Sequence, residues 1–118
     1  RSVRAGLEPL PLADLAPGRA GAEAALSEAG VVLNATSAGM RGEPFPALAA
    51  AATPRSCLFY DLVYTAERTP FVELARRARR PAANGLGMLL HQGALAFELW
   101  TGASAPLAVM RRALRRGV

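Results

Sequence analysis

Lysine is absent from this chain, and all 14 of its Lys/Arg positions hold arginine. No lysine Schiff base or lysine general acid can therefore come from the chain itself. With nine acidic residues the net charge is +5, and such charge attracts nucleic acid in a salt-sensitive way. Aromatic residues are scarce, at 6% of the sequence, and no recognition motif accompanies the arginine runs at 76–80 and 111–116. We interpret both runs as solvated helix faces and expect no nucleic-acid partner.

Cysteine and long apolar runs are also nearly lacking. The single cysteine, Cys57, lies in the apolar run SCLFYDLVY and cannot form an internal disulfide. This fits a reducing cytoplasm, and we predict that Cys57 is a small buried core residue. The longest apolar candidate, 87–100, is interrupted by polar residues such as His91. With no run of about 18 apolar residues and no signal-peptide pattern at Arg1, we expect a cytoplasmic protein with no membrane partner.

What the sequence does contain is a composition that is 52% apolar over 118 residues, enough for one domain or part of one. Short apolar runs at 31–33 and 58–64 predict buried strands. Sequence patterns predict helices at 21–28, 47–52, 69–80, 88–100 and 105–116, a loop over 1–20, and a turn, with or without a short strand, over 82–87. This alternation predicts an α/β fold with a parallel sheet.

Ligands of parallel sheets bind at the carboxyl ends of the strands, which here are the segments 34–39 and 61–64. The segment 34–39 is small and polar, and it suits either a turn that caps a strand or a loop that approaches a nucleotide. Asp61 lies in an apolar strand, where an ionised carboxylate needs partners. It fits equally a structural acceptor for loop N–H groups and a member of a site, with the Tyr64 hydroxyl near the same mouth.

The turn at 84–88 leads into a long helix and is the third candidate. Gly85 and Gly87 allow unusual φ values and close backbone contact with a ring. Met88 and Gln92 share one helical face, a turn apart. A thioether against a flat ring and an amide toward a hydroxylated substrate would be one use of this pair; core packing or solvent exposure is the more common one.

Three segments, taken in order and spacing, resemble the shikimate dehydrogenase family. They are NATSAGM at 34–40, YDLVY at 60–64 followed by TPF at 69–71, and NGLGMLLHQGALAFELWTG at 84–102. The resemblance covers residues 31–115, and the last segment is the most specific of the three. It implies an oxidoreductase of aromatic amino acid biosynthesis that interconverts 3-dehydroshikimate and shikimate, with NADP as cofactor.

The implied fold is α/β, the C-terminal part of a Rossmann-like parallel three-layer sandwich that lacks its first strand and glycine-rich loop. Residues 1–118 then form an incomplete C-terminal NADP-binding domain. Residues 104–118 form its C-terminal helix, which packs back toward an N-terminal substrate domain that is not in this sequence. The last helix would expose an apolar face without that domain, so a homodimer is an alternative partner.

The resemblance also implies roles for individual residues. Six positions match the cofactor-lining residues of the family: Asn34, Ala35, Thr36, Leu62, Gly85 and Met88. Two positions match substrate contacts: Tyr64 and Gln92. The first three line the ribose and phosphate side, and the others flank the nicotinamide, where Leu62 departs from the methionine that the family often has. No metal ligands are implied.

Parts of the family's machinery are not in this sequence. The acid–base pair is a lysine and an aspartate of the N-terminal domain, so no catalytic residue is assigned here and we predict that the chain alone is inactive. The G-x-G-G phosphate loop is also absent, and without it the helix N-terminus that neutralises the pyrophosphate is missing. The segment 1–4 is only a weak match to the tail of the motif that reads the 2′-phosphate, so preference for NADP over NAD does not follow.

Two alternatives stay open. One is a quinate or aminoshikimate dehydrogenase, which shares these motifs because the discriminating residues lie mostly in the missing half. The other is a non-catalytic nucleotide-binding module derived from the same fold, which the absence of the phosphate loop weakens.

Overall fold

The computed structural model describes residue 6 and residues 8–65 and 68–117, so the segment 1–4 lies outside the described residues. The elements follow in the order η1 (Leu12–Leu15), α1 (Ala20–Leu26), β1 (Val31–Asn34), η2 (Ala50–Ala52), β2 (Leu58–Asp61), α2 (Pro70–Arg77), β3 (Ala82–Ala83), α3 (Leu86–Thr101) and α4 (Leu107–Arg116). The strands form one sheet in the order β1-β2-β3, and both pairings are parallel. The predicted α/β fold with a parallel sheet is confirmed.

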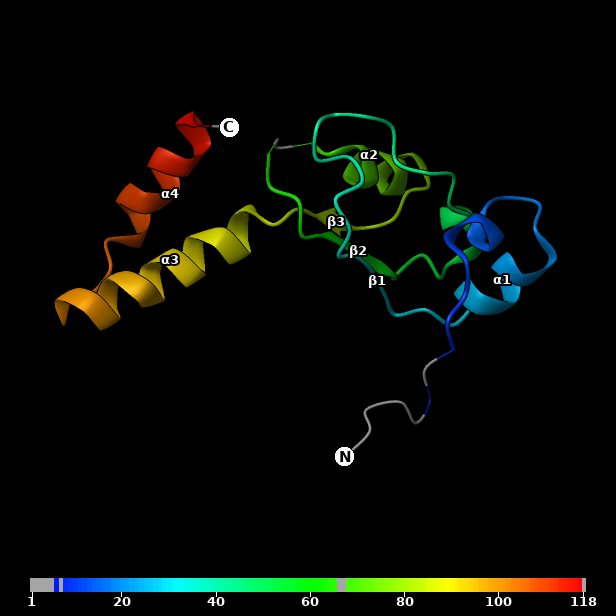
Figure 1. Ribbon diagram of the computed structural model, residues 1–118, viewed down its shortest axis with the longest axis horizontal. Helices are drawn as coiled ribbons and strands as arrows, with labels where there is room; N and C mark the ends of the chain where they lie inside the picture. Colours follow the sequence, from blue (N-terminus) through cyan, green and yellow to red (C-terminus); the bar gives the residue numbers. More distant parts are fainter. Residues whose placement is uncertain (1–5, 7, 66–67, 118) are drawn as a thin grey trace.

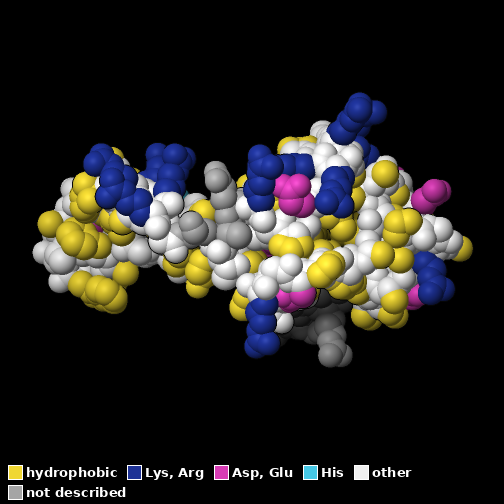
Figure 2. Space-filling model, turned by 90° about the horizontal axis from the view of Figure 1, so that it is seen from above, with side chains coloured by type: hydrophobic (Ala, Val, Ile, Leu, Met, Phe, Trp, Pro, Cys, Tyr) yellow, Lys and Arg dark blue, Asp and Glu magenta, His cyan; other side chains and the backbone are white. Residues whose placement is uncertain are grey.

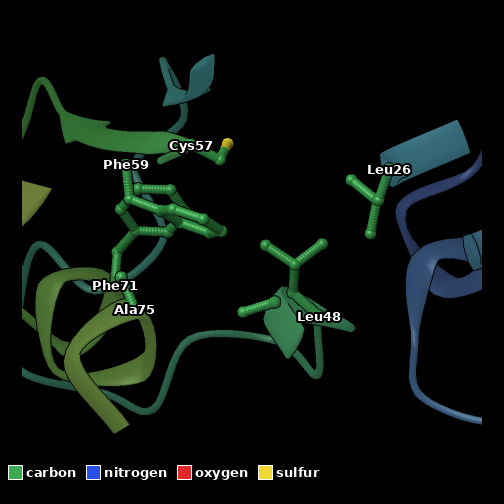
Figure 3. Packing of buried hydrophobic residues seen from close by; sticks show 7 residues of the cluster. Leu26, Leu48, Cys57, Phe59, Phe71 and Ala75 are labelled. Carbon is green, nitrogen blue, oxygen red and sulfur yellow. The ribbon is translucent and has the colours of Figure 1, made fainter. Parts of the chain in front are cut away.

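The core lies on one face of the sheet, against α1, η2 and α2. Side chains alternate along β2, so that Phe59 and Asp61 are fully buried while Leu58 remains 37% exposed. The Phe59 and Phe71 rings pack with centroids 5.5 Å apart, and Figure 3 shows them beside Cys57, with Leu26 and Leu48 facing this group. The prediction that Cys57 is a buried core residue is confirmed.

The opposite face of the sheet carries no helix in the described part of the chain. Its exposed side chains include Val31 and Leu33, which are 60% and 55% accessible. Parallel sheets are normally covered on both faces. The described residues therefore form two layers of a three-layer sandwich, namely the sheet and the helices on its core face. Figure 1 shows α3 and α4 side by side and extending away from the sheet. No helix in the described ranges is long and apolar enough to cross a bilayer.

Several boundaries differ from the sequence predictions. The second strand ends at Asp61 rather than Tyr64, because the Asp61 carboxylate accepts a hydrogen bond from the Val63 N–H and turns the chain. Only Ala50–Ala52 of the expected helix at 47–52 forms, as a 3₁₀ turn. The long helix begins at Leu86, two residues early, and η1 interrupts the expected loop over 1–20.

Candidate functional site

A buried polar cluster joins the carboxyl ends of β1 and β2 to the start of α2. Asn34, Asp61 and Thr69 are each at most 2% exposed. The Asp61 carboxylate accepts hydrogen bonds from Asn34 Nδ2 at 2.9 Å, from the Val63 N–H at 3.0 Å and from Thr69 Oγ1 at 2.5 Å. Three donors compensate for the burial of this carboxylate. Of the two interpretations of Asp61, the contacts support the structural acceptor.

The loop after β1 is wound around the side chain of Asn34. Its Oδ1 accepts from the Thr36 N–H at 3.0 Å and from Thr36 Oγ1 at 2.7 Å, while Nδ2 also donates to the Ala38 carbonyl at 3.3 Å. Thr36 Oγ1 accepts in turn from the Ala38 N–H. Because both side chains are engaged within the loop, a ligand here would chiefly meet its backbone and the exposed methyl of Ala35.

The turn before α3 packs directly against the segment after β2. Gly85 N–H donates to the Val63 carbonyl at 3.1 Å, and Leu62 N–H donates to the Asn34 carbonyl at 3.0 Å. A Cβ on Gly85 would lie 2.4 Å from the Leu62 carbonyl oxygen. The φ of Gly85 is −75°, an ordinary value, and Gly87 is not among the glycines with positive φ. The expectation of unusual φ values at these glycines is therefore wrong. Glycine is required at position 85 because the Leu62 backbone lies too close for a side chain.

The other predicted site residues lie on the surface around this turn. Met88 is 40% and Tyr64 is 44% exposed, Gln92 is exposed, and Leu62 is half-buried. Met88 and Gln92 lie one above the other on α3, and Gln92 stands about 9 Å along the helix from Leu86. The structure thus brings Asn34, Leu62 and Gly85 together, through the Leu62 N–H to Asn34 carbonyl hydrogen bond and the packing of Gly85 on the Leu62 carbonyl. Met88 follows in the first turn of α3, and Gln92 lies one turn farther along that helix.

Two residues that organise this edge were not singled out as site residues. Thr69 caps α2 as predicted, accepting from the Val72 N–H. Its hydrogen bond to Asp61 links α2 to the end of β2, and these segments meet only in the folded chain. Glu43 Oε1 and Oε2 accept from the Gly39 and Arg41 N–H groups, each at 2.9 Å. Backbone hydrogen bonding at Glu43 itself, and then from Gly39 and Arg41, holds the pKa of this carboxyl below its usual value, against an opposing effect of desolvation. Nothing in the sequence around Glu43 signals this role.

Comparison with known proteins finds similarity in both sequence and fold. Residues 85–115 match the family described as the shikimate 5′-dehydrogenase C-terminal domain. A shikimate dehydrogenase (NADP(+)) of Streptococcus pneumoniae is 44% identical over 84 residues, which make up 71% of this chain and 30% of that protein. The aligned region is therefore much longer than the segment that carries the family match.

Solved structures give the same result for the fold. The shikimate 5-dehydrogenase of Thermus thermophilus in complex with NADP(H) and shikimate superposes with a TM-score of 0.68 at 34% identity, covering 96% of this chain and 39% of that one. The quinate dehydrogenase of Corynebacterium glutamicum in complex with NAD has a TM-score of 0.70 at 29% identity, covering 81% of this chain and 34% of that one. The Rossmann-like α/β architecture is thereby established.

The chain spans 30% of the length of the curated relative and 39% of the Thermus thermophilus protein. Within that span its parallel sheet, the buried Asn34–Asp61 link and the Gly85 turn form one continuous edge. On these similarities the chain belongs to the shikimate dehydrogenase family and corresponds to the C-terminal part of its members.

Proposed function

We propose that this chain forms the cofactor-facing wall of an NADP-dependent oxidoreductase that interconverts 3-dehydroshikimate and shikimate. The observation that carries the proposal is the meeting of three segments at the carboxyl edge of the sheet, through the Leu62 N–H to Asn34 carbonyl and Gly85 N–H to Val63 carbonyl hydrogen bonds. Ligands of parallel α/β sheets bind at this edge. The named activities of the matched relatives supply the reaction.

The residues present fit the nicotinamide end of such a cofactor. Leu62, which is half-buried, and Met88, which is 40% exposed, offer an apolar and a thioether surface near the Gly85 turn, which packs against the Leu62 carbonyl. The cofactor supplies hydride transfer when bound. In this proposal Ala35 and the backbone around Thr36 border its ribose side, while Tyr64 and Gln92 orient the substrate hydroxyls.

The proposal extends to the rest of the protein. Residues 104–118 are expected to lie toward an N-terminal substrate domain that supplies the lysine and aspartate acid–base pair. The buried, unpaired Cys57 is consistent with a reducing, cytoplasmic location. Quinate dehydrogenase activity is the second candidate, because a quinate dehydrogenase is among the structural relatives.

The proposal is tested by replacing the matched 39% of the Thermus thermophilus enzyme with this chain and following NADP reduction by shikimate and by quinate. We expect shikimate-dependent activity in the chimera and no turnover by the 118-residue chain alone. Turnover of 3-dehydroshikimate by the chain alone would show that the argument from the missing acid–base pair is wrong. A chimera that folds but binds no NADP would contradict the proposed wall.

Variants in the chimera separate the two sides of the site. Gln92→Ala removes a proposed hydrogen bond to substrate, so the KM for shikimate should rise about tenfold, as for a bond worth ~1.4 kcal/mol, with the KM for NADP nearly unchanged. Met88→Ala should act mainly on the NADP side. His91→Ala, an exposed neighbour on α3, is the matched control and should change neither constant. An unchanged shikimate KM in Gln92→Ala would contradict its assignment.

A further inference from the structure

A recess between α2, the end of β3, α3 and α4 is bordered by three arginines, Arg76, Arg111 and Arg115. Arg76 lies in the last turn of α2, whereas Arg111 and Arg115 are one turn apart on α4. The fold therefore brings together charges that are more than thirty positions apart in the sequence. Figure 2 shows dark-blue arginine side chains both over the α3 and α4 part at the left and over the part of the molecule beside it.

The charge of these three arginines is not compensated within the described part of the chain. None of the described residues that line the recess is acidic. The ion pair found among the described residues joins Arg68 to Glu73 and involves none of the three. Like charges placed a helical turn apart, as Arg111 and Arg115 are, disfavour the arrangement slightly, and a bound anion would reverse that effect.

The recess also has an apolar floor on a well-anchored helix pair. Leu86 and Leu90 of α3 and Leu114 of α4 line it. The hairpin between α3 and α4 is fixed by Glu98, whose Oε1 accepts from the Ala105 N–H at 2.9 Å. Met110 Cε of α4 lies 3.5 Å from the position of a Cβ on Gly93, an ordinary van der Waals distance, so the two helices are in contact there.

We propose that this recess binds the phosphoryl group of a small phosphorylated organic molecule. Guanidinium groups donate paired hydrogen bonds to phosphate oxygens. Three guanidinium groups carry more positive charge than a single carboxylate needs, which favours a phosphoryl group. The leucine floor would then contact the organic part of the ligand. Leu86 and Leu90 are about 200° around α3 from the Met88 and Gln92 stripe, so the recess is distinct from the proposed cofactor wall and does not depend on it.

The test is a titration of the 118-residue chain with inorganic phosphate and with phenyl phosphate at constant ionic strength, followed by calorimetry and by backbone amide shifts. We expect both to bind, phenyl phosphate more tightly because its ring covers the leucine floor, with shifts at Leu86, Gly87 and Arg111. Arg111→Gln combined with Arg115→Gln should weaken phenyl phosphate binding about tenfold or more. All of these arginines are exposed, and circular dichroism checks that the variants fold.

The matched control is Arg112→Gln combined with Arg116→Gln, which removes the same charge from the same helix outside the recess. Its effect should stay below about twofold once ionic strength is fixed. If both double variants weakened phenyl phosphate binding equally, the attraction would be a non-specific one to a basic helix, of the kind that also attracts nucleic acid. That result would overturn the proposal. So would an absence of phosphate binding, or displacement of phenyl phosphate by NADP, which would place the recess within the cofactor site.

Discussion

Gly85 shows how a single residue can be required without an unusual backbone angle. At this position the main chain of the α3 turn lies against the carbonyl of Leu62, and any Cβ would come within 2.4 Å of the Leu62 oxygen and 3.0 Å of its carbon. Both atoms belong to backbone that is itself hydrogen-bonded to β1. The contact therefore has no flexible partner that could move aside, and it fixes where α3 begins relative to the sheet.

Gly85→Ala is expected to lower the free energy of unfolding by about 1–3 kcal/mol, the usual cost of overpacking a tight site. Gly87→Ala is the matched control, because no atom lies within 4 Å of a Cβ at Gly87 and the residue is inside α3. That change should stabilise the chain by roughly 0.5–1 kcal/mol. Urea denaturation followed by circular dichroism measures both, and a harmless Gly85→Ala would show that the backbone contact is not rigid.

At the scale of elements, α2 is fixed at both ends by side chains. Thr69 caps its first turn and also binds Asp61. At the other end Arg79 adopts a left-handed φ of 57°, and the Arg80 N–H donates to the Ala75 carbonyl. This is the Schellman ending of a helix with arginine where glycine is usual. It directs Arg80 back across the sheet edge toward η2.

The Arg80 guanidinium links α2 to the segment around η2. It donates to Thr53 Oγ1 at 3.1 Å and to the carbonyls of Ala78, Ala51 and Thr53. Arg80→Gln cannot span these acceptors, so we expect a loss of about 2 kcal/mol of stability, typical of hydrogen bonds from a charged donor. Arg77→Gln, at an exposed position with no such bond to the residues that the structure describes, should change stability by less than about 0.5 kcal/mol. Equal thermal midpoints for the two variants would refute a structural role for Arg80.

These contacts also show where sequence reasoning succeeds and where it stops. The helix start at Thr69 and Pro70 was predicted because the cap depends on residues within one turn. The Asn34 to Asp61 hydrogen bond was not, because it joins positions 27 apart through the register of two parallel strands. For the same reason the arginine run at 76–80 predicts a solvated position for Arg80, because local charge does not reveal the carbonyls of Ala51 and Thr53 that only the fold brings near.

In the candidate site, too, the sequence identifies the segments but not the contacts of their side chains. Its segments, 34–36, 62–64 and 85–92, were identified from the resemblance, and the parallel sheet accounts for their meeting at one edge. The side chains of Asn34 and Thr36 turn out to be engaged within their own loop. Which atoms remain exposed to a ligand depends on hydrogen bonds that no periodicity or composition encodes.

At the scale of the whole molecule, the chain is less compact than its length predicts. Its radius of gyration is 16.9 Å, against about 13.5 Å for a compact domain of this length. Figure 1 shows the reason: α3 and α4 extend away from the sheet as an arm. Leu95, Leu99 and Trp100 of α3 are 68%, 82% and 81% exposed, and we name them the α3 ridge. The apolar exposure expected of the last helix thus lies mainly on its neighbour, with Val109 of α4 adding to it at 61%.

An apolar ridge of this kind predicts that the isolated chain pairs with a second copy of itself through α3. Leu95→Gln combined with Leu99→Gln should raise the dimer dissociation constant roughly a hundredfold or more, since burying each leucine contributes about 1.5–3 kcal/mol. Sedimentation velocity over a range of concentrations measures the change. Val31→Thr, on the bare face of the sheet, is the control: Val31 is also 60% exposed, but threonine keeps the β-branched shape that suits a strand. If Val31→Thr dissociated the dimer while the double variant did not, the uncovered sheet and not the arm would be the contact surface, and the arm would then have to be accounted for by a different partner.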